Sequence, residues 1–417
     1  MPGFKAALFR FVCLLCLLPT VHGQTPSTSK NYPTTQRDAA KPGAPTPASL
    51  NDSEARLLEI YRLTSAGQTD LALEQAAKLA RDYPNFQLAQ LVYGDLLMAR
   101  ARPLRQLGDV PDPVASNKSE ALDALREESR RRVKAFNERP PEGTIPSAFL
   151  TLAKANKHAI AVDAAKSRLY LFEHQNQQLK LVADFYVSVG KQGTDKTTRG
   201  DLRTPVGVYF ITGAVDAKQL PDFYGAGALP INYPNMLDAR RGKTGSGIWL
   251  HGTPSNQYAR APLATDGCLV LANNDLNFLL KTVEPKTTPV LIAQQLEWLK
   301  ADYVAGDHNQ FEHAFMAWRT AKSRGELSKT LSFYTPDFNS FGKDLKQWKT
   351  VLQKDMSHKA SKRLAYDNVS LLRWADHEEV MMVTFDESPH QGAAVTKRQY
   401  WIRQANHWKI FFEGIIG

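Results

Sequence analysis

Cys268 is the first candidate for chemistry in this chain, because it is the only one of three cysteines that lies outside the first 23 residues. Exported proteins normally use cysteines in pairs, as disulfides, and a lone cysteine has no partner to bond. A thiolate is a strong nucleophile when a base or a positive neighbour lowers the pKa of its thiol. Cys268 is therefore interpreted as a nucleophile.

The neighbours of Cys268 fit that interpretation. Gly267 precedes it at the start of an apolar run, so we expect a tight turn that exposes the sulfur where a strand begins. His251 ends the strand Ile248–Leu250, 17 residues before Cys268, and two adjacent strand ends would bring imidazole and thiol together. His251 would be the base, and the amides of Gly267 and Cys268 would form an oxyanion hole.

Two other interpretations stay open on spacing alone. His251 and Cys268 are also explained as a core histidine and an inert buried thiol. A metal site built from His251, Asp266 and Cys268 is a further alternative, although it lacks the paired short spacings of structural zinc sites. Thiol labelling tests the first alternative: an activated Cys268 should label well below the ordinary thiol pKa of about 8.5, whereas a buried inert thiol should label slowly.

The first 23 residues resemble a signal peptide. Lys5 and Arg10 precede a short apolar run, residues 11–21, and Gln24 follows a plausible cleavage site. We expect cleavage and a periplasmic protein, with an uncleaved membrane anchor as the alternative. Residues 24–50 are rich in Pro, Thr, Ser and Ala, which predicts a disordered linker.

The composition is that of a globular protein with an excess of basic over acidic residues. Hydrophobic residues make up 43% of the chain, and the net charge of +10 falls to +8 when the predicted signal peptide is removed. Export makes nucleic acid an improbable partner, so an anionic envelope surface is the better match for the excess charge. A solvated basic face explains the same excess.

Residues 51–140 are predicted to be helical. Apolar positions from Leu57 to Leu63 follow a 3.6-residue period, and further helices are expected at 71–83, 86–101 and 118–136. Gly67, Ala72, Ala76 and Tyr83-Pro84 resemble one tetratricopeptide-type helix pair. This region is either a helical spacer or a surface for an envelope protein partner.

Two further compositions follow the helices. Residues 145–295 contain short β-rich runs with Gly-rich connections, which predicts a mostly-β domain. Residues 305–417 give two or three helices and then four strand-like runs, an α+β order that resembles the NTF2-like family together with Tyr400-Trp-Ile-Arg and Trp408-Lys-Ile. The chain is thus a multidomain α/β protein, and the last domain could pair two copies into a dimer.

Three segments resemble the catalytic domain of the L,D-transpeptidase, or YkuD, family: Arg203-Thr-Pro-Val-Gly, Leu250-His-Gly-Thr and Thr265-Asp-Gly-Cys-Leu. The family pattern is a Thr-Pro-x-Gly strand, then His-Gly, then Ser/Thr-x-Gly-Cys, and all three match in order. The resemblance covers roughly residues 145–295. It implies a cysteine acyl-transfer enzyme that acts on peptidoglycan stem peptides.

By position, the resemblance implies that Cys268 attacks the carbonyl between the L-centre of diaminopimelate and the terminal D-residue of a tetrapeptide stem, forming a thioester. His251 would act as base and then as acid, and Gly267 would contribute to the oxyanion hole. An acceptor amine would give a crosslink or an attached protein, and water would give a tripeptide. No metal and no organic cofactor is expected.

Substrate contacts are expected from Thr265, Gly252, Trp249 and Tyr233. Trp249 and Tyr233 belong, with Tyr224 and Arg240-Arg241, to a long irregular segment before His251 that would form a lid. The alternative is ordinary packing for each aromatic residue and a solvated face for the arginine pair.

Two departures from the family pattern bear on the reaction. Asp266 stands where many members have His, and Val270 where many have Arg or Asn, so the choice of acceptor does not transfer. The pairing with an NTF2-like module also resembles a cell-shape-determining subgroup that acts as an L,D-carboxypeptidase. Transpeptidation is the first hypothesis, carboxypeptidation the second, and a non-catalytic envelope scaffold the third.

Overall fold

The computed structural model describes residues 52–109, 112–176, 178–301, 309–359, 364–389 and 393–416. These residues belong to one compact unit, Pro47–Gly417. The predicted signal peptide and the predicted linker lie outside the described residues. Within the described part of the chain, no helix is long and apolar enough to cross a membrane.

The N-terminal region is helical, as the periodicity predicted. Its helices are α1 (Asp52–Ser65), α2 (Thr69–Asp82), α3 (Gln87–Ala99) and α4 (Asp112–Asn137). Leu57, Leu79 and Val92 of the first three helices share one buried apolar cluster, and Tyr258 from the middle domain joins it. The helical region is therefore packed onto the middle domain through that tyrosine.

A buried group of charged side chains, here named the junction cluster, ties this region to the middle domain. It consists of Glu54, Glu128, Arg132, Arg168 and Asp184, each at most 5% exposed. Arg132 pairs with both glutamates at 2.8–2.9 Å, and Arg168 pairs with Glu54 at 2.8 Å and with Asp184 at 2.6 Å. Because every member has an oppositely charged partner, the cluster satisfies the buried charges that the sequence places there.

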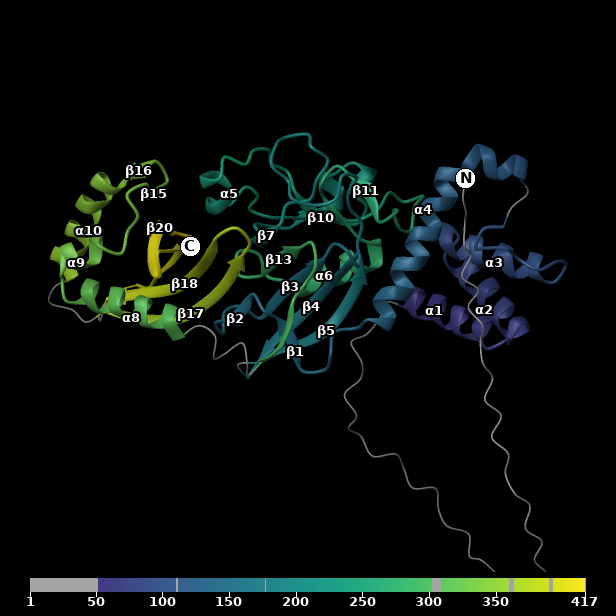
Figure 1. Ribbon diagram of the computed structural model, residues 1–417, viewed down its shortest axis with the longest axis horizontal. Helices are drawn as coiled ribbons and strands as arrows, with labels where there is room; N and C mark the ends of the chain where they lie inside the picture. Colours follow the sequence, from purple (N-terminus) through teal and green to yellow (C-terminus); the bar gives the residue numbers. More distant parts are fainter. Residues whose placement is uncertain are drawn as a thin grey trace, which may run out of the picture. The chain divides into compact units, whose positions relative to one another are not determined.

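The middle domain is built on a five-stranded sheet in the order β5-β4-β3-β13-β7 (Figure 1). Its strands are β3 (His158–Asp163), β4 (Arg168–Gln175), β5 (Gln178–Tyr186), β7 (Gly207–Phe210) and β13 (Pro289–Ala293). Only β3 and β13 run parallel, and the other neighbours are antiparallel. The strands β3, β7 and β13 are buried almost throughout, which explains their continuous apolar runs.

A smaller four-stranded sheet has the order β12-β10-β9-β8, and it carries His251 at the end of β10 and Cys268 directly before β12. The strands are β8 (Val215–Asp216), β9 (Gly227–Pro230), β10 (Trp249–His251) and β12 (Leu269–Val270), and a third sheet pairs β6 (Val189–Gly190) with β11 (Leu263–Thr265). The connections contain the short helices η1 (Ala217–Gln219), η2 (Asp222–Tyr224) and α5 (Met236–Arg240), and the longer α6 (Asn273–Thr282).

The described part of the C-terminal domain contains the helices α8 (Asn309–Ser323), α9 (Leu327–Leu331) and α10 (Leu345–Lys359). They accompany a sheet in the order β2-β17-β18-β19-β20, whose last four strands are β17 (Leu364–Ala375), β18 (Glu379–Pro389), β19 (Val395–Gln404) and β20 (His407–Ile415). Each of these elements was expected from the sequence. Two short hairpin strands, β15 (Asn339–Ser340) and β16 (Lys343–Asp344), complete the domain.

The first strand of the C-terminal sheet comes from a distant part of the chain. β2 (Phe149–Thr151) pairs with β17, and β1 (Thr144–Pro146) pairs with β14 (Trp298–Lys300). The sequence expectation had placed residues from 145 onward in the middle domain. Phe149 is buried in the apolar cluster that also holds Trp401, so its burial, and not its place in the sequence, decides which sheet it joins.

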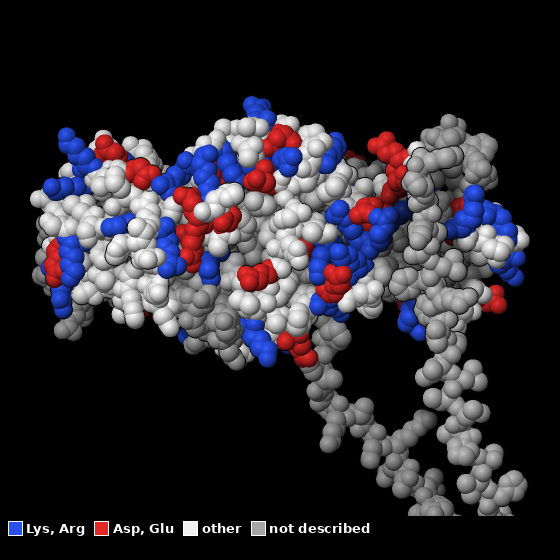
Figure 2. All heavy atoms as spheres, in the orientation of Figure 1, with Lys and Arg blue, Asp and Glu red and all other residues white. Residues whose placement is uncertain are grey.

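The arginine pair of the expected lid is ion-paired to the C-terminal domain. Arg240 contacts Asp337 at 2.8 Å, and Arg241 contacts Asp376 at 2.7 Å. The alternative of a solvated face was therefore wrong for Arg241, whose side chain is 19% exposed. Elsewhere on the face in view, basic and acidic side chains are interspersed, so the positive excess forms no single uniform patch there (Figure 2).

Candidate active site

The structure brings His251 and Cys268 to neighbouring strands. β10 and β12 run parallel, with Leu250 opposite Leu269 and His251 opposite Val270. Cys268 directly precedes β12 and is thus beside Trp249, on the same face as His251 because side chains alternate along a strand. Both His251 and Cys268 line one cavity of about 500 Å³. The expectation that adjacent strand ends bring the two residues together is confirmed.

The turn before Cys268 requires a glycine. Gly267 has φ +125°, and a Cβ there would lie 2.6 Å from the carbonyl oxygen of Arg203. Thr265 fixes the same turn, because its Oγ1 donates to the Cys268 carbonyl at 2.7 Å and accepts the Gly267 amide at 3.1 Å. The Gly267 amide is therefore engaged within the loop, and its part in an oxyanion hole stays a prediction.

His251 is held in a defined tautomer. Its Nδ1 lies 2.8 Å from the carbonyl oxygen of Gly252, which can only accept, so Nδ1 carries the hydrogen and Nε2 is left with the lone pair. The ring is 1% exposed and lies 5.0 Å from the ring of Tyr224 and 5.7 Å from that of Phe223. Burial, with a contribution from Arg260, lowers the pKa of His251 to about 4, so the imidazole is neutral at physiological pH.

Burial raises the pKa of the Cys268 thiol above its ordinary value, although the Trp249 backbone and the charge of Arg260 act in the opposite direction. The sulfur lies 3.5 Å from the Gly247 carbonyl oxygen. The resting site therefore pairs a neutral thiol with a neutral imidazole. An activated cysteine was expected to label well below pH 8.5. This geometry instead predicts that the thiol of the free enzyme labels at higher pH.

Basic side chains line the cavity that holds Cys268. Lys191 pairs with Asp266 at 3.0 Å and Lys196 with Asp201 at 2.7 Å. Arg199 and Arg260 also line the cavity, and neither forms an ion pair with a residue in the described part of the chain. Arg260 instead lies 4.5 Å from the centre of the Phe223 ring. Two cations are thus available to an anionic ligand beside the thiol.

The expected substrate contacts divide into two groups. Thr265 lines the cavity, whereas Trp249, Gly252 and Tyr233 do not belong to its lining. Tyr233 is 5% exposed, sits in the core of the middle domain and donates to the Thr244 carbonyl at 3.1 Å. The carbonyl oxygen of Gly252 accepts the hydrogen bond from Nδ1 of His251. A Cβ added at Gly252 would lie 2.0 Å from Oδ1 of Asn273.

Sequence reasoning missed Arg260 and Phe223 as site residues. Arg260 lies in the spacer between the His-Gly and Asp-Gly-Cys segments, where no motif marks it, and only the folded loop places it near Cys268. Asp266, considered as a metal ligand, is largely exposed and paired with Lys191. Among the described residues, no group of three or more His, Cys, Asp or Glu side chains is arranged to hold a metal ion.

Two family models match the chain. Residues 157–292 match the L,D-transpeptidase catalytic domain, YkuD, and residues 310–414 match the Cds6 C-terminal NTF2-like domain. The chain therefore carries a catalytic domain of the L,D-transpeptidase family followed by an NTF2-like domain. A search of curated proteins returned no match.

Two solved structures resemble the fold of this chain. The Bdellovibrio bacteriovorus protein Bd1075 is 23% identical, with a TM-score of 0.56 over 66% of this chain and 98% of its own. The helical cell shape determining protein Pgp2 from Campylobacter jejuni is also 23% identical, with a TM-score of 0.53 over 64% of this chain and 95% of its own. At these identities the likeness concerns the fold alone.

Proposed function

We propose that this protein is an exported cysteine acyl-transferase that cleaves the bond between diaminopimelate and the terminal D-residue of a peptidoglycan tetrapeptide. The observation that carries the proposal is the pair His251 and Cys268, on adjacent parallel strands and facing one cavity within an L,D-transpeptidase-family domain. Export through the predicted signal peptide would bring the enzyme to the periplasm, where this substrate lies.

The neutral resting pair defines how the thiol would be activated. Nε2 of His251 would take the proton of Cys268 as the sulfur attacks the substrate carbonyl, which avoids a separate thiolate at rest. The imidazolium would then pass that proton to the amine of the departing D-residue as the carbon–nitrogen bond breaks. A thioester on Cys268 remains, with the thiol proton now on the leaving group.

The basic lining would recognise the substrate. A tetrapeptide stem carries carboxylates, including the one on its terminal D-residue, and Arg199 and Arg260 are the cavity cations without an ion-pair partner in the described chain. Charge-assisted hydrogen bonds from arginine to carboxylate are strong and directional. The aromatic rings of Phe223 and Tyr224 would cover the peptide beside His251.

Resolution of the thioester decides between two activities. Attack by the amine of a second stem would give a 3-3 crosslink, and attack by water would give a tripeptide; in both, His251 accepts the proton of the attacking group and returns it to sulfur. We place transpeptidation first. Hydrolysis is the second candidate, because this chain shares its fold with a protein that determines helical cell shape, and trimming of stem peptides would suit such a role.

The test is mass spectrometry of disaccharide tetrapeptides incubated with the full-length mature protein. Dimers with 3-3 linkage would establish transpeptidation, and tripeptide monomers would establish carboxypeptidation. Cys268→Ala is the control: it should abolish either product while the circular dichroism spectrum stays unchanged. Unaltered tetrapeptide with the unmodified protein would contradict both candidates and favour the envelope scaffold.

A further inference from the structure

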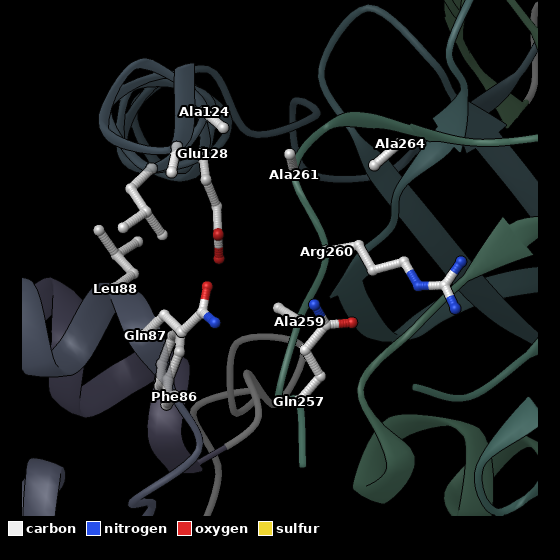
Figure 3. Close-up of a pocket in the computed structure, with 12 residues that line it drawn as sticks. Phe86, Gln87, Leu88, Ala124, Glu128, Gln257, Ala259, Arg260, Ala261 and Ala264 are labelled. Carbon is white, nitrogen blue, oxygen red and sulfur yellow. The ribbon is translucent and has the colours of Figure 1, made fainter. Parts of the chain in front are cut away.

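A second cavity lies between the helical region and the loop that carries Arg260. It has a volume of about 380 Å³, within the range of small-ligand sites. One wall is formed by the start of α3 and one face of α4, and the other by the loop 257–264 (Figure 3). We name it the helical groove; it is lined by Phe86, Gln87, Leu88, Ala121, Ala124, Leu125, Glu128, Gln257, Ala259, Arg260, Ala261 and Ala264.

The helical groove adjoins the cavity that His251 and Cys268 line, here named the catalytic cavity. Arg260 and Ala264 line both spaces, so one stretch of loop is the common wall. In Figure 3 the guanidinium of Arg260 points away from the helices, and the same residue lines the cavity beside Cys268. A ligand that fills the cavity beside Cys268 therefore reaches the edge of the helical groove at Arg260.

The common wall is fixed in place from both sides. The ring of Tyr258 stacks on Phe86 at 4.3 Å, and its hydroxyl contacts Ser53. On the other side, the Tyr186 hydroxyl donates to the Arg260 carbonyl at 2.8 Å. Because one anchor joins the apolar cluster of the helices and the other comes from strand β5, the loop is held by both the helical region and the middle domain.

The polar groups of the helical groove suit a peptide that bears an amine. The carboxylate of Glu128 and the amide of Gln87 point into the space between helix and loop, and Gln257 faces them from the opposite wall (Figure 3). Glu128 is 3% exposed, and both hydrogen bonds that Arg132 donates to it go to Oε1. Amide side chains pair with peptide groups, and a carboxylate pairs with an ammonium group.

We propose that the helical groove binds the second stem peptide of a substrate in which two stems are already joined. This inference rests on the proposed function, since it assigns the first stem to the catalytic cavity. The second stem would place its peptide groups against Gln87 and Gln257 and its free amine against Glu128. The helical region would thus act as part of the substrate site and not as a spacer.

Binding to the Cys268→Ala protein tests this without turnover. The probes are a disaccharide tetrapeptide monomer and the amide-linked dimer of two such units, titrated by calorimetry. We expect the dimer to bind about tenfold more tightly than the monomer. Ala124→Trp, which fills the helical groove, should remove that difference and leave the affinity for the monomer unchanged.

Two further variants keep the result interpretable. Arg130→Trp places the same bulk on the same helix at an exposed position outside the helical groove, and should preserve the preference for the dimer. Gln257→Ala removes one amide without adding bulk and should weaken dimer binding alone, which covers the case that Ala124→Trp disturbs folding. Equal affinity for monomer and dimer before any groove substitution, or a preference that survives both groove variants, would overturn the proposal. Failure of the catalytic proposal would appear separately, as unaltered tetrapeptide in the turnover experiment.

Discussion

The catalytic cavity and the junction cluster both gather charged side chains, but they treat them in opposite ways. In the junction cluster, Arg132 and Arg168 are 2–3% exposed and each is paired with two carboxylates. In the catalytic cavity, Arg199 and Arg260 have no ion-pair partner among the described residues, and His251 and Cys268 are held neutral by burial. A buried arginine that is already paired serves the fold, whereas an arginine left without an ion-pair partner beside Cys268 is available to a ligand.

The largest expected effect comes from removing the proposed base. His251→Ala should lower the rate of product formation by roughly a hundredfold to ten-thousandfold, because proton transfer from Cys268 loses its acceptor. Initial rates on a disaccharide tetrapeptide give the measurement. His158→Ala is the matched control: this histidine pairs with Glu284 outside the cavity and should leave the rate unchanged. Full activity in His251→Ala would remove the catalytic interpretation of the cavity.

Substitutions in the junction cluster should lower the stability of the fold. Arg168→Ala leaves Glu54 and Asp184 with less compensation in a buried place, which we expect to lower the free energy of unfolding by about 3–5 kcal/mol. Arg130→Ala breaks an exposed pair with Glu127 and should cost less than about 1 kcal/mol. Urea denaturation of both variants measures the difference. Equal losses would mean that pairing in the cluster contributes no more than a surface ion pair.

Arg260 should affect substrate binding more than folding. Arg260→Met keeps an apolar stem over Phe223 and removes the charge, so kcat/KM for the tetrapeptide should fall about tenfold to a hundredfold, mainly through KM. Steady-state kinetics with a substrate whose terminal carboxylate is amidated provides the control. If Arg260 binds that carboxylate, the amidated substrate should lose little further activity in the variant; an equal loss on both substrates would contradict this role.

The smallest effect concerns the pH dependence of the thiol. Because burial raises the pKa of Cys268, iodoacetamide labelling of the free enzyme should increase with a midpoint above the ordinary value of about 8.5. His251, with its pKa lowered to about 4, stays neutral above that pH and should lose its role as base only as the pH falls through it. A labelling midpoint below 8 would instead indicate a thiolate already formed at rest. Since a buried scaffold thiol would also label slowly, labelling alone does not separate enzyme from scaffold, and turnover is the deciding measurement.

Much of the element order was predictable, because it depends on local patterns. The helices α8 and α10 and the strands β17 to β20 follow apolar periodicities of 3.6 and 2 residues, which are properties of short stretches of chain. The pairing of β2 with β17 was not predictable, since Phe149 and Leu372 lie far apart in sequence and only the shared core selects them as neighbours.

The sequence by itself determined which residues could do the chemistry: Cys268 after a glycine, His251 before one, and the motif that relates them. Tertiary structure decided what surrounds them. It turned the Gly267 amide toward Thr265, buried Tyr233 in the core and carried Arg260 to the thiol. The physical reason is range: a turn or a strand is fixed by neighbouring residues, whereas burial, ion pairing and pKa depend on segments that meet only when the chain folds.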